Sequence, residues 1–413
     1  MAYAAILGYG VVGSGVHGVL EQNAEMIKKK LGEPVLVKRV LDLRSFPGDS
    51  VESILTHDSE DILGDKEIGI VVETIGGLNP AYEYSKQALS AGKHVITSNK
   101  ELVSVHGAEL MSLAAENNVK YLFEASVGGG IPVIRPLRHW LLTESVSEVA
   151  GILNGTTNYI LSLMSKFGDG FDETLKDAQD RGYAERDPSA DVEGFDACRK
   201  LAIILSLCTG KHINFSKIPT EGISRITKDD FAFAAEDNNT IKLIAKGVIR
   251  GDEIEAVVAP MLLLKDTQLA TVNDVYNAAS FTFNATDDVL FYGRGAGKNP
   301  TAGAVISDIS EALQSGTYDA MWTSDEAVLT NFSESTNTRM VRLASNDVKE
   351  ARLAVEKVFE RSDLIWVDAG IPNQIAFYTP PIKESEYSSK IDKLNHMQGI
   401  SVKQSLMLYT GRS

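Results

Sequence analysis

Apolar runs alternate with helix-periodic stretches through the first third of the chain. Residues 2–8 have the pattern of a buried strand, and a helix is predicted to follow as far as about Leu31, where Gly32 would end it in the left-handed conformation. Further strands are predicted at 35–41, 68–72, 94–97 and 120–123, with helices at 81–91 and 106–117. Strands and helices that alternate in this way predict an α/β fold built on an open parallel sheet.

A glycine-rich segment directly follows the first predicted strand. Gly8, Gly10 and Gly13 form the pattern G-x-G-x-x-G, with Val11 and Val12 between its second and third glycines. The pattern alone is common, but here it lies between a strand and a helix, where glycines let the backbone approach a pyrophosphate and the helix N-terminus attracts its charge. Residues 1–131 are therefore predicted to form a Rossmann-type dinucleotide-binding domain.

Polar and glycine-rich clusters also follow the other predicted strands of this domain. The residues concerned are Thr74 and Gly76 after 68–72, Ser98 and Lys100 after 94–97, and the segment 124–130 after 120–123. Because ligands bind at the carboxyl ends of parallel strands, these clusters predict the rim of a single cofactor crevice.

The end of the second predicted strand carries both Asp42 and Arg44. An acid at this place hydrogen-bonds the ribose 2′-hydroxyl of NAD, whereas a nearby arginine accommodates the 2′-phosphate of NADP. Asp42 also lies farther from Gly13 than the usual spacing of about 20 residues, which a long first helix would explain. Lys38, Arg39 and Arg44 cluster here and slightly favour NADP, so the predicted cofactor is NADP or NAD, with the preference left open.

The rest of the chain is predicted to form two more domains and a connecting segment. Residues 132–292 alternate helices and strands, with strand candidates at 257–264 and 281–283, and form an α+β domain. Gly295 and Gly297 then open a helix at 302–313. This turn could close over the cofactor or simply join two domains. The first is favoured, so 293–318 is predicted to return to the dinucleotide-binding domain.

Residues 319–413 have a different order of elements. Strands are predicted at 339–344, 364–367, 374–378 and 401–408, with helices at 347–361 and 384–397. The order is βαββαβ, which predicts a small domain with two helices on one face of a sheet.

The segment 182–200 concentrates charged groups around a loop that runs into a helix. It holds Glu185, Asp191, Glu193, Asp196 and Lys200, and an apolar stripe after the lysine predicts that the helix packs against a core. Asp196 and Lys200 stand four residues apart, so they share one helical face. Such a set suits the binding of a small zwitterion and the movement of a proton, and the alternative is a solvated, charged helix start.

Composition limits the class of protein. A chain of 413 residues with 44% hydrophobic residues is expected to form two or three globular domains, and no apolar run is long enough to span a bilayer. The net charge of −16 argues against nucleic acid or an anionic membrane as a partner. With no leader-like segment at the amino terminus and only Cys198 and Cys208 as thiols, the expected location is cytoplasmic.

Several segments taken together resemble homoserine dehydrogenases. These segments are 8–13, 72–77, 98–100, 123–132, 151–161, 182–200, and 295–297 with Pro300 and Thr301. The likeness extends in order over about residues 1–315, and 182–200 is its most specific part. It implies NAD(P)-dependent interconversion of L-homoserine and L-aspartate 4-semialdehyde, in the biosynthesis of threonine, methionine and isoleucine. Since the first strand begins at the first residues, the monofunctional form, without a fused aspartokinase, is expected.

The resemblance also implies a role for individual residues. It makes Lys200 the acid–base group at the substrate oxygen, Lys100 its partner where cofactor and substrate meet, and Glu185 a contact of the substrate ammonium. The further substrate contacts that it implies are Asp196, Asp191, Tyr183 and Thr156, and Gly182 would contact the nicotinamide. The protonation state of Lys200 is left open.

A monovalent cation, taken to be sodium, is implied as well. Its ligands would be Glu124 and the backbone carbonyls of Val127, Gly129 and Ile131, and oxygen-only ligation suits a hard ion. The seven histidines lack zinc-type spacing, so no catalytic transition metal is predicted. The family further implies a homodimer built through the middle domain, which the sequence does not distinguish from a homotetramer.

The βαββαβ tail resembles the ACT regulatory module. The turn after the first strand of that module usually contains an aspartate and a Pro-Gly pair, but residues 345–350 here contain neither proline nor glycine. Packing or assembly is therefore favoured over feedback by threonine.

Two other functions remain open at this point. One is a dehydrogenase of another short amino or hydroxy acid, and for a hydroxy acid arginine is expected where this chain has acids. The other is a non-catalytic dinucleotide sensor, against which the full set of Lys100, Glu185, Asp196 and Lys200 argues.

Overall fold

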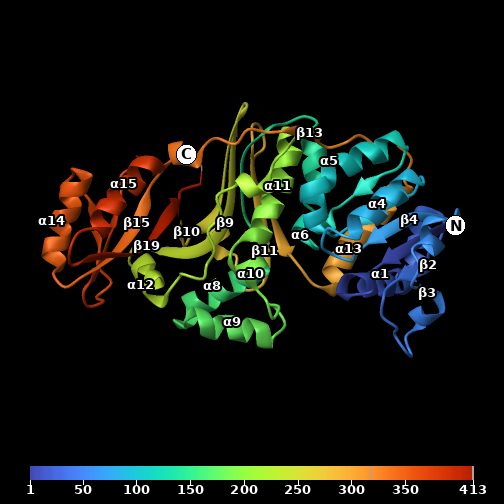
Figure 1. Cartoon of the computed structure of the whole chain (residues 1–413), viewed down its shortest axis with the longest axis horizontal. Helices are drawn as coiled ribbons and strands as arrows, with labels where there is room; N and C mark the ends of the chain where they lie inside the picture. The colour runs from blue at the N-terminus through green and yellow to red at the C-terminus, as the bar shows by residue number, and fades with distance from the viewer. Residues whose placement is uncertain (317, 412–413) are drawn as a thin grey trace. The chain divides into compact units, whose positions relative to one another are not determined.

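The computed structural model describes residues 1–316 and 318–411 (Figure 1). The chain divides into two compact units. Unit 1 contains Met1–Val146, Arg199–Phe215 and Phe283–Ala327, and unit 2 contains Ser147–Cys198, Ser216–Thr282 and the chain from Val328 onward. Segments far apart in the sequence thus meet within each unit, and the four-part division given above remains a prediction.

Unit 1 is built on a six-stranded sheet with the order β3-β2-β1-β4-β5-β6. All neighbouring strands are parallel, which confirms the predicted α/β fold with a Rossmann-type sheet. The strands are β1 (Ala2–Leu7), β2 (Val35–Leu41), β3 (Leu55–Thr56), β4 (Ile68–Glu73), β5 (His94–Thr97) and β6 (Tyr121–Leu122). The helices of this region are α1 (Val11–Gln22), α2 (Ala24–Leu31), η1 (Ser50–Ile54), α3 (Glu60–Leu63), α4 (Ala81–Ser90), α5 (Lys100–Glu116), α6 (Ala125–Gly128) and α7 (Ile134–Trp140).

The sheet is covered on both faces. Helices α1 and α13 (Lys298–Leu313) pack on one face, and α4 and α5 lie on the other (Figure 1). Alternate residues of β1, Ala4 and Ile6, are fully buried in the same apolar cluster as Val16 of α1 and Val305 of α13. The remaining elements of unit 1 are β8 (Lys211–His212), β12 (Asp287–Arg294) and β13 (Thr323–Glu326), and β8 pairs with β13.

Three helix boundaries in unit 1 differ from the prediction, and one of them is the start of α13, which lies at Lys298 rather than at 302, directly after the cap at Gly297. The single helix expected as far as Leu31 is divided at Asn23, whose ψ of 9° leaves the helical region, although Gly32 ends α2 in the left-handed conformation as expected. Asparagine side chains compete with the helical backbone for hydrogen bonds, which favours such a break. Helix α5 begins at Lys100 rather than at 106, because the Asn99 side chain accepts a hydrogen bond from the Leu102 N–H and caps the helix earlier.

Unit 2 contains a mixed sheet with the strand order β11-β7-β9-β10-β19-β15-β17-β16. Its first half is formed by β7 (Val146–Ile152), β9 (Asn239–Arg250), β10 (Glu253–Leu264) and β11 (Tyr276–Phe283). Strands β9 and β10 pair along their whole length as an antiparallel hairpin. The helices here are α8 (Gly155–Phe167), α9 (Phe171–Asp180), α10 (Ser189–Val192), η2 (Phe215–Lys217), α12 (Lys228–Glu236) and η3 (Leu269–Thr271), and α11 (Phe195–Thr209) begins in unit 2 and continues into unit 1.

The tail follows the predicted βαββαβ order, with short elements added. It contains η4 (Phe332–Glu334), β14 (Thr336–Asn337), β15 (Arg339–Ser345), α14 (Val348–Phe359), β16 (Ile365–Val367), β17 (Gln374–Tyr378), β18 (Ile382–Lys383), α15 (Glu384–Asn395) and β19 (Ile400–Tyr409). Val355 of α14 and Leu394 of α15 share one buried cluster with Val341 and Phe377 of the strands, so both helices cover the same face (Figure 1).

The tail sheet is continuous with the sheet of the middle region. Met261–Leu263 of β10 pair in parallel with Met407–Tyr409 of β19. Buried Arg342 of β15 adds an ion pair, since its Nε donates to Asp230 Oδ1 at 2.8 Å and its guanidinium also donates to Thr227 Oγ1. The tail is thus a built-in part of unit 2. Among the described residues, none of the helices combines the length and apolar character that crossing a membrane requires.

Candidate active site

The glycine loop leaves the start of α1 without a side-chain cap. Gly8 has φ +92° at the turn out of β1, and a Cβ at Gly13 would lie 2.0 Å from the Gly8 carbonyl oxygen. Thr74 closes the turn from β4 by donating to the same carbonyl at 2.8 Å. Gly10, the N-cap of α1, supplies no side-chain hydrogen bond, and Val11 is 67% exposed. Open backbone N–H groups at a helix N-terminus fit the pyrophosphate of a dinucleotide.

Asp42 is fixed against this loop at the end of β2. Its carboxylate accepts a hydrogen bond from the Tyr9 N–H at 2.7 Å and forms a two-bonded ion pair with Arg44, with both N···O distances 2.9 Å. The hydrogen-bonded Arg44 guanidinium holds the pKa of Asp42 well below its usual range. The Asp42 side chain is 8% exposed and that of Arg44 is 61% exposed, so the acid is fixed and the arginine faces solvent.

Lys38 has a different environment. Its ammonium forms ion pairs with Asp65 and Glu67, which precede β4. In a parallel sheet the start of β4 lies at the edge opposite to the carboxyl ends where ligands bind. Lys38 therefore gives no support to a preference for NADP, and this part of the sequence reasoning is wrong.

The ends of β4 and β5 are joined by a buried carboxylate. Glu73 accepts hydrogen bonds from the Ile75 and Gly76 N–H groups, and from Thr97 Oγ1 at 2.5 Å. Its burial raises its pKa. Asn99, which caps the helix that begins with Lys100, donates to the Gly77 carbonyl at 2.6 Å. The structure thus brings the clusters around Thr74, Gly76, Ser98 and Lys100 to one edge of the sheet.

Glu124 has a structural role that the sequence did not indicate. Its carboxylate accepts hydrogen bonds from the N–H groups of Val133, Ile134 and Arg135, at 2.6 to 2.8 Å, and so holds the start of α7. The side chain is buried, and its own backbone N–H donates to Asp308 on α13.

The second glycine-rich turn packs on the loop that follows Glu124. Gly129 has φ +58°, and a Cβ there would lie 2.2 Å from the Gly295 carbonyl oxygen. The Gly130 N–H donates to the Arg294 carbonyl. After this turn, Gly297 begins α13, whose Lys298 carbonyl closely approaches Gly15 of α1. The turn therefore contacts both the loop at 129–130 and the helix behind the first glycine motif, within unit 1.

In unit 2 a single amide joins two of the predicted substrate contacts. Asn154 Nδ2 donates to Asp191 Oδ1 at 2.7 Å and to Asp196 Oδ2 at 2.9 Å. Nearby, Thr156 Oγ1 donates to the Tyr183 carbonyl at 2.8 Å, directly after Gly182 with φ +73°. Sequence reasoning missed Asn154, although asparagine is one of the residues preferred as an N-cap.

The remaining predicted residues lie on defined elements. Lys200 follows Asp196 by one turn of α11, and the two are 8% and 4% exposed. The alternative of a solvated helix start is therefore wrong. Lys100 is the first residue of α5, and Glu185 is exposed in the loop between α9 and α10.

Comparison with known proteins assigns this arrangement to a family. A sequence model described as "Homoserine dehydrogenase" matches residues 132–310, and one described as "Homoserine dehydrogenase, NAD binding domain" matches residues 8–124. The chain belongs to the homoserine dehydrogenase family. Homoserine dehydrogenases are NAD(P)-dependent oxidoreductases, so the predicted family is confirmed, and the alternatives of a dinucleotide sensor and of another dehydrogenase are set aside.

This chain is similar to individual homoserine dehydrogenases over most of their length. The chain is 39% identical to that of Bacillus subtilis (strain 168) over 312 residues, which cover 75% of this chain and 72% of the relative. A crystal structure of a homoserine dehydrogenase from Thiobacillus denitrificans has a TM-score of 0.90 at 33% identity and covers 99% of this chain and 98% of its own. A hyperthermophilic archaeal homoserine dehydrogenase solved in complex with NADPH has a TM-score of 0.64 at 26% identity, covering 77% and 99%.

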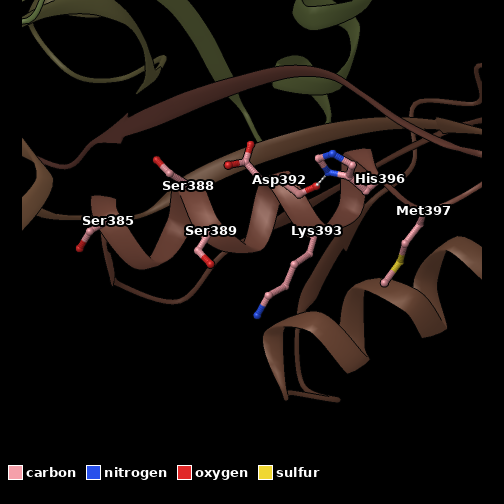
Figure 2. A pocket seen from close by; sticks show the side chains of 7 residues that line it. All are labelled: Ser385, Ser388, Ser389, Asp392, Lys393, His396 and Met397. Atoms are coloured by element: carbon pink, nitrogen blue, oxygen red, sulfur yellow. Dashed lines mark hydrogen bonds between the residues drawn. The ribbon is translucent and has the colours of Figure 1, made fainter.

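A groove in the tail was not signalled by any motif. It has a volume of about 800 Å³ and is lined by side chains of α15 and the turn after it: Ser385, Ser388, Ser389, Asp392, Lys393, His396 and Met397 (Figure 2). His396 Nδ1 hydrogen-bonds the Asp392 carbonyl oxygen, so these two residues are held by their own helix. The groove does not include the turn between β15 and α14.

Proposed function

We propose that this chain interconverts L-homoserine and L-aspartate 4-semialdehyde with NAD(P), using Lys200 as the group that exchanges the proton of the substrate oxygen. The observation that carries the proposal is the family match across both the dinucleotide-binding and the catalytic segments. The burial of Asp196 and Lys200 on one helix supports it, because buried ionisable groups are costly to maintain without a role.

Each predicted residue then has a chemical task. Lys200 takes the hydroxyl proton during oxidation of homoserine and returns it to the carbonyl oxygen in the reverse direction. Glu185 binds the substrate ammonium, and Lys100 assists where cofactor and substrate meet. The further substrate contacts are Asp196, Asp191, Tyr183 and Thr156. The nicotinamide, when bound, supplies the chemistry of hydride transfer, and the glycine loop with α1 would hold the pyrophosphate next to it.

One assay tests this proposal directly. Oxidation of NADPH and NADH is followed by absorbance with L-aspartate 4-semialdehyde as the substrate, and the reverse reaction is followed with L-homoserine. We expect turnover that depends on these substrates. No turnover with either nucleotide, in a folded protein that binds the nucleotide, would contradict the proposed function.

We propose that Arg44 is the residue that accepts the 2′-phosphate of NADP and that Asp42 serves the 2′-hydroxyl of NAD. Arg44→Ala should therefore raise the KM for NADP by roughly 10-fold, the value of one charge-assisted hydrogen bond, with a smaller effect on NAD. Lys38→Ala is the matched control, because the Lys38 ammonium is bound by Asp65 and Glu67. Initial rates with both nucleotides measure the effect, and a shift in the Lys38 variant without one in the Arg44 variant would contradict the assignment.

We propose that a monovalent cation, sodium, binds to Glu124 and to the carbonyl oxygens of Val127, Gly129 and Ile131. The donor set is entirely oxygen, as a hard ion requires. A carboxylate has about four lone-pair sites, so the three N–H groups bound by Glu124 leave a site for a cation. The positive φ of Gly129 turns the backbone within this loop.

A homodimer or homotetramer assembled through the middle region is proposed on the family resemblance, with sedimentation velocity as its test.

The cytoplasm is the proposed location. Its support is that Cys198 and Cys208 are not joined in a disulfide.

We expect L-threonine to leave the initial rates unchanged across millimolar concentrations. In the turn between β15 and α14, the Asp347 carboxylate accepts the Lys349 and Glu350 N–H groups, so it caps α14 and is not directed to an amino-acid ligand. Rates measured with and without threonine at subsaturating homoserine check this expectation. Inhibition that saturates with threonine would contradict it and would make the tail a regulatory module.

A further inference from the structure

Asn154 is held at the start of α8 in a fixed orientation. Its Oδ1 accepts the Thr157 N–H at 2.8 Å and so caps the helix. A backbone N–H can only donate, so the amide oxygen must face Thr157, and the amide nitrogen must face the opposite way. The cap therefore determines which end of the side chain reaches the two carboxylates.

The amide nitrogen donates to both acids. Nδ2 carries two hydrogens, and it lies 2.7 Å from Asp191 Oδ1 and 2.9 Å from Asp196 Oδ2. Asp191 comes from α10 and Asp196 from α11, so one NH₂ group sets the spacing between carboxylates on two different elements. Like charges this close repel each other, and a shared donor offsets that repulsion.

The first turn of α8 is held in place by the hydrogen bonds of Asn158. Asn158 Nδ2 donates to the carbonyls of Val272 and Tyr276, and its Oδ1 accepts from Lys242 Nζ at 3.1 Å. Lys242 is 2% exposed, and its ammonium also donates to Asn273 Oδ1 at 3.0 Å. These hydrogen bonds connect the first turn of α8, next to Asn154, to β9 and to the loop before β11.

We propose that Asn154 is a positioning residue for substrate binding, which holds the Asp191 and Asp196 carboxylates ionised and at a fixed separation. The inference rests on the proposed function, since the substrate role of these two acids comes from that proposal. Lys200 lies on the same helix as Asp196, so α10 and α11 supply the charged groups and the start of α8 supplies the neutral amide that joins the two acids.

Two substitutions separate the positioning role from helix capping. Asn154→Asp and Asn154→Ser both keep a good N-cap residue, so α8 should remain folded. The first replaces the donor with a third carboxylate, and the second removes the donor without adding charge. Asn331→Asp is the control, because Asn331 is an exposed asparagine cap whose side chain accepts the Ser333 N–H at the start of η4.

We expect both Asn154 variants to raise the KM for L-homoserine on the order of 10- to 100-fold, the range for loss of hydrogen bonds to charged groups. The KM for the nucleotide should not change, and Asn331→Asp should match the wild type. The acid limb of the kcat/KM profile should move to higher pH, because the lost donors favoured the ionised carboxylates.

Three results would decide against the inference or its basis. A wild-type KM for homoserine and an unchanged pH profile in both folded variants would overturn the positioning role. A rise in KM that only follows a fall in melting temperature, with the pH profile unchanged, would also overturn it, because it would show a purely structural effect. Absence of homoserine-dependent turnover in the wild type would instead overturn the proposed function.

Discussion

Lys200→Ala is expected to lower kcat for homoserine oxidation by a factor on the order of 10² to 10⁴, the contribution of a positioned acid–base group. Lys200 is buried on α11, one turn after Asp196, so bulk water has little access to take over the proton. Lys200→Arg should be nearly as inactive, because a guanidinium keeps the positive charge but does not give up its proton near neutral pH. Steady-state rates in both directions measure the loss.

The control for this experiment is Lys176→Ala. Lys176 is an exposed lysine that pairs with Asp180 one turn along α9, and its loss should leave turnover unchanged. NADPH binding, followed by its fluorescence, should be retained in all three variants. Near wild-type turnover in Lys200→Ala would show that Lys200 is not the acid–base group.

Glu124→Ala is expected to lower the free energy of unfolding by roughly 3 to 5 kcal/mol, because two buried N–H groups and one partly buried N–H group lose a charged acceptor together. The groups belong to Val133, Ile134 and Arg135, and the Glu124 side chain is buried, so water can replace the carboxylate only in part. Chemical denaturation measures the change, with the denaturant slope checked for constancy.

A matched control exists in the same unit. Glu144 also accepts three hydrogen bonds, from the Ala285 and Thr286 N–H groups and the Thr286 hydroxyl, but these bonds are exposed to solvent. Glu144→Ala should therefore destabilise much less, since water replaces the lost acceptor. Equal effects of the two substitutions would contradict a buried structural role for Glu124, and would leave cation binding as the reason for its presence.

The parallel sheet was predictable because strand and helix periodicity are local. Strands β2, β5 and β17 begin and end at the predicted residues, and the break at Asn23 was missed because a polar residue within a helical pattern carries only a weak signal. The early start of α5 was missed because Asn99 was not recognised as an N-cap, although asparagine is a preferred residue at that position.

The sequence predicts the residues of a candidate site, but it does not predict the hydrogen bonds that join them. The four-residue spacing of Asp196 and Lys200 predicts directly that they share one face of a helix. Asn154, in contrast, lies 37 and 42 residues away in sequence from the two aspartates whose carboxylates its amide joins. The carboxylate of Glu124 likewise binds N–H groups about ten residues ahead, and the Lys38 ammonium binds Asp65 and Glu67 in the turn before β4. Contacts of this kind depend on how the chain folds back on itself, which no periodicity records.

The pairing of β10 with β19 has a consequence for biosynthesis. About 140 residues separate the two strands, so the edge of β10 stays open on the ribosome while the whole of the tail is being made. An unpaired strand edge is a template for association with other chains. The Met261–Leu263 edge of β10 is therefore expected to favour self-association until β19 has been made, and a chain truncated ahead of Ile400 would keep that edge unpaired.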